Sequence, residues 1–516
     1  MQPRPYQTAF IESVEHGWKE FSKQLGVAPT GSGKTIIFSH LSKRLFDDTG
    51  KRTLILCHRE ELIDQAITKL HSATGILAQK EKAEFCASLN APVVVASIQT
   101  MIRRLDKWPA DHFGLVVCDE AHHSISDSWS TVLDHFNANI LGVTATPDRG
   151  DKRSLGVFYE NIAHEISLID LIKDGYLSPI TIRSLPLVID LSHVGSTAGD
   201  FDSGQLGNAL EPYLGQIAVS LREAIGKRKT LCFLPLIATS KKFIDACQSV
   251  GLTADHIDGE SPDRKEKLAA FERGDFQILS NAMLLTEGYD CPAISCIVNL
   301  RPTRSRALYA QIAGRGTRIA EGKENLLLLD FLFQHERHKI CRPASLIAKN
   351  EEEADAMTEL AEQKSADAQY GEDQLDLMEL ASEAQHAREE ALRDRLAALA
   401  NRKAKFISAE QFALQHKHME VAEFEPTMKW HDEPATEKQR EWIEKAGVDP
   451  DTVNGKGHAS AVLGVYFEWK QHQPASDKVK KLMRWKRWQS LDGLRGPDTA
   501  TQNDAKDFFA SGAMKR

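Results

Sequence analysis

Short apolar runs separated by longer amphipathic stretches make up the first 340 residues of the chain. Four of these runs lie at 53–57, 93–97, 115–118 and 140–143, and the stretch at 35–46 has helical spacing. Short apolar runs predict buried strands, and strands that alternate with helices predict parallel sheets. A second series of the same type begins near residue 176. We therefore expect an α/β protein with two tandem parallel-sheet domains, at 1–175 and 176–345.

The pattern changes after residue 345. Residues 346–405 are rich in Ala, Glu, Leu and Gln at helical spacing, which predicts a helical arm. We expect a solvated acidic linker here; the alternatives are an arm that docks on the α/β domains or on a partner protein, and an acidic guard over a nucleic-acid groove. Residues 406–495 predict a small, mainly helical domain with helix caps at Thr436 and Ser476. Residues 496–516 are expected to be disordered.

Composition places the chain among ordinary globular proteins. It has 516 residues, of which 42% are hydrophobic and 27% charged, and roughly 150 residues per domain predicts about three domains. No apolar run reaches the roughly 18 residues that a membrane-spanning helix needs, so we expect no membrane partner and a cytoplasmic location. The eight cysteines include no C-x-x-C pair. We expect them to be reduced core residues, without disulfides or zinc.

The net charge of −9 at first disfavours a nucleic-acid partner, but the charge is unevenly distributed. Residues 351–394 hold fifteen Asp and Glu against three Lys and Arg, a local charge of −12, so the rest of the chain carries +3. Local patches rather than the sum attract a polyanion. The sequence therefore permits nucleic acid as a partner.

The stretch Ala28–Thr35 fits the phosphate-binding pattern G-x-x-x-x-G-K-[ST], with Ala28 in place of the first glycine. Backbone N–H groups of such a loop, together with the start of the following helix, surround an anion. Lys34 would reach the outer phosphates of a nucleotide, and Thr35 would bind Mg²⁺. The remaining loop residues expected around the phosphates are Thr30, Gly31, Ser32 and Gly33.

Two acidic residues follow the apolar run at 115–118. Asp119 would hold the magnesium ion, directly or through water, and Glu120 would polarise the water that attacks the phosphate. Polar side chains at strand ends are where an open α/β sheet places its ligand. Arg59, Gln99 and Thr100 lie at such ends, and we interpret them as contacts to a nucleic-acid backbone or as ordinary loop caps.

Two arginines near the end of the second α/β series have the chemistry that phosphoryl transfer needs. Arg315 and Arg318 are three positions apart, so on a helix they would lie one turn apart and both would face the nucleotide. Guanidinium groups stabilise the negative charge that spreads over the transferred phosphoryl oxygens. We therefore predict that ATP bound on the first domain is hydrolysed with help from the second.

These motifs, in this order, resemble those of superfamily 2 helicases of the DEAD/DEAH type, over residues 1 to about 340. The opening at 4–7, the motif at 286–290 and the run at 301–305 are most similar to the group that contains the XPB, RadD and UvsW helicases. The resemblance implies two RecA-like domains, ATP as substrate, Mg²⁺ as cofactor and 3′ to 5′ movement on DNA in repair, recombination, replication or phage-related metabolism. An RNA helicase, or a DNA-docking motor subunit of a larger repair or defence assembly, remains the alternative.

The resemblance also assigns roles to individual residues. Gln7, with Arg4 beside it, would read adenine, whereas Thr286 would contact the nucleic-acid backbone. Residues implied near the ribose and the catalytic water are Glu287, Gly288 and Asp290, and Gln311 is implied in catalysis. Residues implied in coupling the nucleotide site to the second domain are His122, Thr144 and Thr146. RadD-like relatives carry zinc-binding cysteines after the motor domains, whereas this chain has no cysteine beyond Cys341, so we expect no zinc.

The C-terminal region, which resembles accessory regions of phage helicases, combines basic and aromatic residues at 477–488. Basic side chains pair with phosphates, and aromatic rings stack on bases. We expect either a DNA contact here or two tryptophans packed in a small core. The residues on which this prediction rests are Lys480, Lys481, Trp485 and Trp488.

Overall fold

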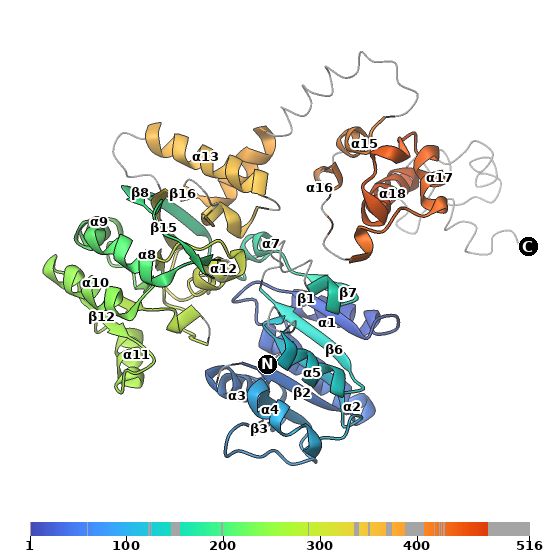
Figure 1. The fold of residues 1–516 in the computed structure, drawn as a ribbon, viewed down its shortest axis with the longest axis horizontal. Coiled ribbons are helices and arrows are strands. Elements are labelled where there is room, and N and C mark those ends of the chain that lie inside the picture. The colour runs from blue at the N-terminus through green and yellow to red at the C-terminus, as the bar shows by residue number, and fades with distance from the viewer. Residues whose placement is uncertain are drawn as a thin grey trace, which may run out of the picture. The chain divides into compact units, whose positions relative to one another are not determined.

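Two sheets flanked by helices, followed by a small helical unit, make up the fold (Figure 1). The computed structural model describes residues 2–58, 60–121, 124, 126–145, 155–197, 200–286, 288–334, 340–348, 351–367, 374–387, 407–416, 418–422, 424, 426 and 429–472. The chain divides into two units, Met1–Arg388 and Glu389–Arg516, and each is described by itself.

The first sheet has seven parallel strands in the order β3-β4-β2-β5-β6-β1-β7. The strands are β1 (Lys23–Val27), β2 (Arg52–Cys57), β3 (Gln79–Glu81), β4 (Val93–Ser97), β5 (Phe113–Asp119), β6 (Asn139–Thr144) and β7 (Asn161–Glu165). The four runs predicted as strands in this half of the chain are all confirmed.

Successive side chains of each strand point to opposite faces of the sheet and therefore pack in different hydrophobic cores. In β2, Ile55 and Cys57 belong to the core under α1 (Pro5–Gly17), α2 (Lys34–Thr49) and α3 (Glu60–Thr74). Leu54 and Leu56 belong to the core under α4 (Ile98–Arg103) and α5 (Asp127–His135). The first sheet is therefore covered by helices on both faces, which is why its strands are apolar throughout rather than alternating.

The second sheet also has seven strands, in the order β12-β13-β11-β14-β15-β8-β16, and only β16 is antiparallel. The strands are β8 (Ile180–Asp190), β11 (Thr230–Phe233), β12 (Ala254–Ile257), β13 (Ile278–Asn281), β14 (Cys296–Asn299), β15 (Leu326–Gln334) and β16 (Leu375–Asp376). The predicted fold class of two tandem parallel-sheet domains is confirmed.

Helices again cover both faces of the second sheet. One core lies under α8 (Ser203–Leu210), α9 (Leu214–Ala224) and α10 (Ile237–Ser249). The other receives side chains from α11 (Arg264–Arg273), α12 (Arg306–Gly314) and α13 (Glu351–Asp367). The short helix α7 (Leu168–Lys173) lies in the chain between the two sheets, and a small hairpin, β9 (Ser196–Thr197) with β10 (Asp200–Phe201), follows β8.

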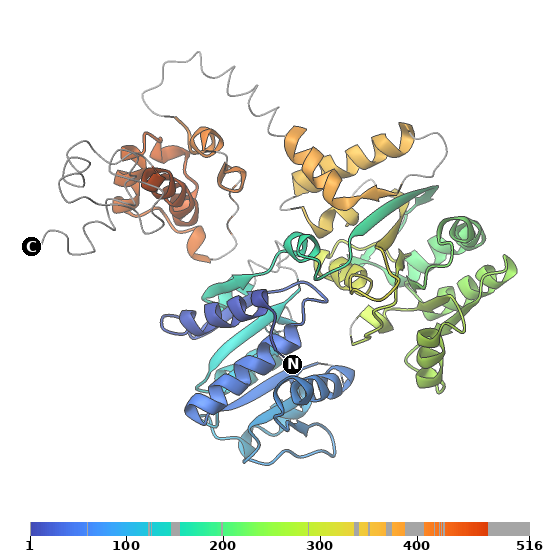
Figure 2. The same ribbon diagram turned by 180° about the vertical axis from the view of Figure 1, so that it is seen from behind.

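The segment predicted as a solvated linker is instead part of the second domain where it is described. Met357 of α13 is fully buried, and Leu377 and Leu380 join it in the same core. β16 pairs with β8, so the chain returns to the edge of the sheet and α13 lies beside it (Figures 1 and 2). The prediction of a solvated spacer is therefore wrong for 351–367 and 374–387, because a few apolar positions suffice to bury one side of an otherwise acidic helix.

The C-terminal unit contains α15 (Ala409–Gln415), α16 (Met419–Ala422), α17 (Glu437–Lys445) and α18 (Gly455–His472), which share one core. The predicted cap at Thr436 is confirmed, since its side chain accepts a hydrogen bond from the backbone of Gln439. Ser476, the DNA contacts expected at 480–488 and the end at 496–516 lie outside the described residues.

All eight cysteines are described and none forms a disulfide. Six are buried, as predicted, whereas Cys86 is exposed and Cys341 is half-buried. Among the helices that the structure describes, none combines the length and apolar character needed to span a membrane.

Candidate nucleotide-binding site

The loop between β1 and α2 forms an anion-binding turn. Gly31 and Gly33 have φ values of 90° and 81°, a left-handed conformation in which a Cβ atom would be strained. Gly33 is the N-cap of α2 and has no side chain that could cap the helix. The first N–H groups of this 16-residue helix therefore point at the loop without an intrahelical partner, as a phosphate site needs.

Lys34 and Glu120, which lie at the start of α2 and directly after β5, form a shielded ion pair. Lys34 Nζ lies 3.1 Å from Glu120 Oε1, and the two side chains are 13% and 10% exposed. Glu120 has a φ of 59°, a left-handed value that costs a non-glycine residue about 1–3 kcal/mol. Such strain concentrates at functional sites, and here it turns the carboxylate from the strand end toward the loop.

The second domain contributes to the same carboxylate. Gln311 of α12 donates from Nε2 to Glu120 Oε2 over 3.3 Å. Thr317 donates from Oγ1 to the backbone oxygen of Thr30 over 3.3 Å. A Cβ atom on Gly314 would lie only 2.3 Å from Thr30 Cβ, so the backbones of the two domains meet closely here. The predicted loop, acid and glutamine are thus brought together from segments nearly 300 positions apart.

The two arginines are placed differently from the prediction. The helix α12 ends at Gly314, Arg315 caps it, and Arg318 lies beyond the helix, so the two do not share a helical face. Arg315 is buried and donates from Nη1 to the backbone oxygen of Tyr289 over 2.9 Å. Arg318 pairs through Nε with Asp290 Oδ1 at 3.1 Å. The helical-turn argument is therefore wrong, because the glycines at 314 and 316 end the helix before the second arginine.

Arg318 nevertheless lies against the phosphate loop. A Cβ atom on Gly31 would be 3.7 Å from Arg318 Cγ. Burial lowers the pKa of the Arg318 guanidinium, and the neighbouring carboxylate of Asp290 opposes this shift. We call the contact between the phosphate loop of the first domain and residues 311–318 of the second domain the seam. Within the described part of the chain, three buried polar atoms of these segments make no hydrogen bond: Thr30 Oγ1, Ser32 Oγ and Arg318 Nη1. Hydroxyl and guanidinium donors without acceptors suit a ligand that brings anionic oxygens.

Asp290 is held between the two domains. Lys69 of α3 pairs with Asp290 Oδ2 at 2.9 Å, and Gln65 on the same helix donates to the backbone oxygen of Gly288. Burial alone would raise the pKa of Asp290, but Arg318 and Lys69 outweigh it, so its pKa lies below the usual value. Asp290 is therefore a carboxylate that holds a cation from each side of the seam.

The loop that carries Arg318 is fixed by Lys323, which the sequence did not single out. Its ammonium donates to the backbone oxygens of Arg318 at 2.6 Å and Pro292 at 3.4 Å, and also to that of Gly316. Burial, with Arg318 nearby, lowers the pKa of Lys323 to about 7. The Lys323 side chain thus links the backbone of Gly316 and Arg318 to that of Pro292 through hydrogen bonds.

Gln7 contacts the phosphate loop directly. Its Nε2 donates to the backbone oxygen of Ser32 over 2.9 Å, and its Oε1 accepts from the backbone of Arg4 over 2.9 Å. Tyr6 also donates to Ser32, and its ring lies 4.9 Å from that of Tyr176, over which the Arg4 guanidinium stacks at 5.1 Å. The adenine-reading role of Gln7 stays a prediction, and the Tyr6–Tyr176 pair is an aromatic surface beside it that no sequence motif indicates.

The expected magnesium ligands lie on the elements that frame the loop. Thr35 is in the first turn of α2, and Asp119 is the last residue of β5. Hydroxyl and carboxylate oxygens are ligands that Mg²⁺ takes together with phosphate oxygens. The described residues contain no group of three or more His, Cys, Asp or Glu that could hold a metal ion, and a site built on one carboxylate and one hydroxyl would not form such a group.

The remaining predicted site residues divide into three sets. Gln99 is exposed in the first turn of α4, and Thr100 beside it accepts from Ser97 Oγ over 2.9 Å. Thr286 and Thr144 are buried, and Thr286 donates internally to Met283, so neither hydroxyl faces the surface here. The residues that lie outside the described ones are Arg59, His122, Thr146, Glu287, Lys480, Lys481, Trp485 and Trp488.

A Ser–His–Asp arrangement in the second domain is structural. Ser240 Oγ lies 2.7 Å from His256 Nδ1, and His256 Nε2 lies 3.1 Å from Asp258 Oδ2. Ser240 is fully buried and also bonds Ser280 at 2.5 Å. No substrate can reach that hydroxyl, so the cluster joins β12, β13 and α10 rather than forming a hydrolase site.

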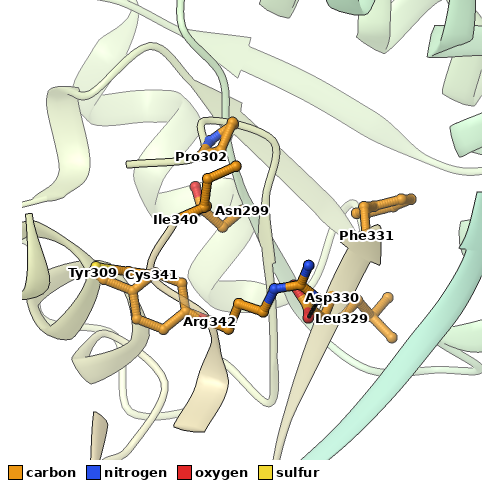
Figure 3. Close-up of a pocket in the computed structure, with 9 residues that line it drawn as sticks. All are labelled: Asn299, Pro302, Tyr309, Leu329, Asp330, Phe331, Ile340, Cys341 and Arg342. Carbon is orange, nitrogen blue, oxygen red and sulfur yellow. Dashed lines mark ion pairs between the residues drawn. The ribbon is translucent and has the colours of Figure 1, made fainter. Parts of the chain in front are cut away.

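Tyr309 of α12 lines a small pocket (Figure 3). Tyr309 lies there with Asp330 of β15 and Arg342, whose Nη1 is 3.9 Å from Asp330 Oδ2. Arg342 also pairs with Glu362 of α13 at 2.9 Å. Burial raises the pKa of Asp330 to about 6. Arg342, which lines the pocket together with Tyr309 of α12, thus links this pocket to α13 through Glu362.

Two family models match the chain. Residues 1–149 match the model described as type III restriction enzyme, res subunit, and residues 214–320 match the helicase conserved C-terminal domain. The first match ends after β6 and the second contains α12, so together they include the loop, the acid pair and the two arginines.

Named relatives are similar to the same region. A candidate ATP-dependent helicase from Saccharomyces cerevisiae, IRC3, is 32% identical over 352 residues, covering 64% of this chain and 51% of the yeast protein. A candidate mitochondrial ATP-dependent helicase from Schizosaccharomyces pombe is 31% identical and covers 64% of this chain and 57% of its own length. The chain therefore spans little more than half the length of these relatives.

Two solved structures share the fold. A fragment of a candidate HsdR subunit of a type I restriction enzyme from Vibrio vulnificus superposes with a TM-score of 0.52 at 24% identity, over 64% of both chains. The type ISP restriction-modification enzyme LlaBIII bound to DNA gives a TM-score of 0.54 at 14% identity, over 99% of this chain and 42% of that one.

Proposed function

We propose that this chain, which belongs to the superfamily 2 helicases by its two family matches, is an ATP-driven translocase or helicase that acts on DNA. The observation that carries the proposal is the contact of Glu120 with both Lys34 and Gln311. It joins the phosphate loop and the acid of the first domain to a catalytic candidate of the second. Hydrolysis that depends on this seam is coupled to how the two domains meet.

The chemistry follows from the residues at the seam. When ATP binds, its outer phosphates replace Glu120 as the partner of Lys34, which frees the carboxylate to polarise water. Thr35 and Asp119 would hold Mg²⁺, which neutralises charge on the phosphates. Gln311, at hydrogen-bond distance from the same carboxylate, orients the water. Burial of Lys34 and Glu120 excludes other water and strengthens each electrostatic interaction.

Arg318 supplies the charge that makes hydrolysis sensitive to domain closure. The aliphatic stem of Arg318 lies beside Gly31, and its guanidinium is paired with Asp290. A small movement of the second domain would carry Nη1 onto a phosphate, and an arginine supplied in this way contributes about 10³ to 10⁵ in rate. After hydrolysis the Lys34–Glu120 and Arg318–Asp290 pairs re-form. The proposed cycle alternates between these two sets of ion pairs.

DNA is favoured over RNA by the motifs most similar to the XPB, RadD and UvsW group and by the DNA named in the LlaBIII complex. A motor subunit within a larger assembly is a second candidate, because the Vibrio vulnificus structure is a fragment of a restriction-enzyme subunit. Of the predicted nucleic-acid contacts, Gln99 is exposed at the carboxyl edge of the first sheet, where a strand can reach it.

The test is the rate of ATP hydrolysis with single-stranded DNA, duplex DNA or RNA, together with displacement of streptavidin from a biotinylated strand. We expect DNA to stimulate hydrolysis and the protein to displace streptavidin. Lys34→Ala should abolish both, while Lys43→Ala, which alters a surface lysine of the same helix that pairs with Asp47, should leave both unchanged. Stronger stimulation by RNA, or none by any nucleic acid, would contradict the proposal.

A further inference from the structure

The loop after β3 presents an aromatic ring to solvent. Phe85 is 47% exposed, although the loop around it is held by a network of hydrogen bonds and ion pairs. Lys82 and Phe85 exchange backbone hydrogen bonds of 3.1 and 2.8 Å, which close a tight turn. Ala83 within the turn has a φ of 46°, a strained value for a residue with a Cβ atom. The loop therefore holds one specific conformation with its ring outward.

A buried carboxylate fixes this loop from beneath. Glu81 is fully buried and pairs with Arg104 and with Lys107, whose Nζ lies 2.7 Å from Oε2. Burial would raise the pKa of Glu81, but the two cations outweigh it and its pKa lies below the usual value. Glu81 also accepts from the backbone of Ala87 over 2.9 Å. Burying a carboxylate with two cations costs desolvation free energy. In this loop the cluster of Glu81, Arg104 and Lys107 holds the backbone after β3 in place.

The same two cations hold the chain on either side of the ring. Arg104 donates to the backbone oxygens of Phe85, at 3.0 Å, and of Ala83. Lys107 donates to the backbone oxygen of Ala87 over 2.7 Å. The backbone around the ring is thus held at Ala83, Phe85 and Ala87. Because the loop is already ordered, it loses little conformational entropy when a partner binds the ring.

The loop after β3 lies at the edge of the first sheet where the proposed function places the bound nucleic-acid strand. β3 and β4 are parallel neighbours, so the loop after β3 and the helix α4 after β4 begin at the same edge. The backbone N–H of Ala83 donates to Thr100 Oγ1 over 3.3 Å. Thr100 and Gln99 are the residues predicted to contact a nucleic-acid backbone. Phe85 is therefore within the same loop cluster as those phosphate contacts.

One cation lies against the ring, and the segment around it carries a small excess of positive charge, although Lys80 also pairs with Asp64, and Arg104 and Lys107 pair with Glu81. The ammonium of Lys80 stacks over the Phe85 ring with its Nζ 4.8 Å from the centroid. Residues 79–107 contain five Lys and Arg against three Asp and Glu, and one of those acids is the buried Glu81. An exposed aromatic ring on a segment with a net positive charge suits a nucleobase attached to phosphates.

We propose that Phe85 is a stacking platform for one base of a single strand bound across Gln99 and Thr100, a site that extends the nucleic-acid path of the first domain. The proposal rests on the proposed function. Every base has a π-face, so the contact is independent of sequence and suits an enzyme that moves along its substrate. Because the ring is preorganised, it adds affinity without ordering the loop.

The test is the affinity of the full chain for a single-stranded oligonucleotide, measured by fluorescence anisotropy. Phe85→Ala should weaken binding about 5- to 160-fold, the range expected for one stacked base. Phe85→Trp should retain binding. A fluorescent base analogue in the oligonucleotide should be quenched by the wild type and by Phe85→Trp but not by Phe85→Ala. ATP hydrolysis without nucleic acid should be the same in all three proteins.

Leu89→Ala is the matched control, since Leu89 is 44% exposed in the same segment and has no ring. Equal losses in Leu89→Ala and Phe85→Ala would overturn stacking in favour of a general apolar surface, such as one that binds a protein. Unchanged binding by Phe85→Ala would overturn the inference while leaving the proposed function intact. If the wild type bound neither DNA nor RNA, the proposed function itself would fail.

Discussion

Replacing Lys323 with methionine removes the ammonium that fixes the loop carrying Arg318. The ammonium donates to three backbone oxygens, among them those of Arg318 and Pro292. Methionine keeps a similar unbranched stem but cannot donate, so the change isolates the hydrogen bonds. All three acceptors belong to the second domain, whereas the phosphate loop belongs to the first. We therefore expect kcat to fall and the KM for ATP to stay close to the wild-type value.

The size of the effect follows from the bonds that are lost. Because the pKa of Lys323 is about 7, the comparison is made at about pH 6.5, where most of the side chain is charged. One hydrogen bond from a charged donor contributes about 1.5–3 kcal/mol. If one such bond holds Arg318 in place in the transition state, kcat falls about 13- to 160-fold, at about 1.36 kcal/mol for each factor of ten. This is less than the factor of about 10³ expected for loss of the arginine itself. The assay is nucleic-acid-stimulated ATP hydrolysis at increasing ATP concentration.

Two controls separate positioning from general destabilisation. Lys323→Arg keeps a charged donor and should recover most of the activity. The pKa of Lys323 is about 7 in the folded protein and 10.5 as its ordinary value, so the unfolded chain binds the extra proton between these limits. The stability of the wild type relative to Lys323→Met should therefore rise from pH 7 toward 10. Thermal unfolding of both proteins at several pH values measures this difference. A kcat for Lys323→Met within twofold of the wild type, when both are folded, would refute the reasoning.

Three further predictions concern the seam, the arm and the pocket. Gly314→Ala should lower kcat without loss of ATP binding, because the new Cβ would lie 2.3 Å from Thr30 Cβ and hold the domains apart; an unchanged kcat would contradict this. Met357→Ala should cost about 2–5 kcal/mol in denaturant unfolding, since Met357 is fully buried, whereas a solvated spacer would show no loss. The pKa of Asp330 is raised from 3.8 to about 6, so the folded state binds the proton more tightly in this window. Wild-type stability should fall as pH rises from 4 to 6, and Asp330→Asn should lack this component; parallel pH profiles of the two proteins would argue against it.

The parts of the fold that the sequence predicted are those with a strong local signal. Strands such as β4 are buried on both faces, so they form continuous apolar runs that periodicity finds directly. The phosphate loop was found because left-handed backbone at Gly31 and Gly33 requires glycine. Chemistry that depends on residue type and local geometry is therefore predictable from the order of residues alone.

What the sequence missed depends on contacts between distant segments. Lys323 and Lys69 look like ordinary surface lysines in the sequence, and only the fold brings them to Arg318 and Asp290. The end of α12 was missed because a spacing of three suits a helix as well as a turn. The arm was misjudged because its acidic composition hid the few apolar side chains, such as Met357, that bury one face.

The central claim is that ATP is held by the first domain and hydrolysed with help from the second. The most direct measurement compares ATP affinity with single-turnover hydrolysis in Lys34→Ala and Arg318→Ala, each in the presence of DNA. We expect Lys34→Ala to lose activity together with ATP affinity. Arg318→Ala should keep near wild-type affinity and hydrolyse about 10³-fold more slowly. Hydrolysis by Arg318→Ala at the wild-type rate would contradict the account.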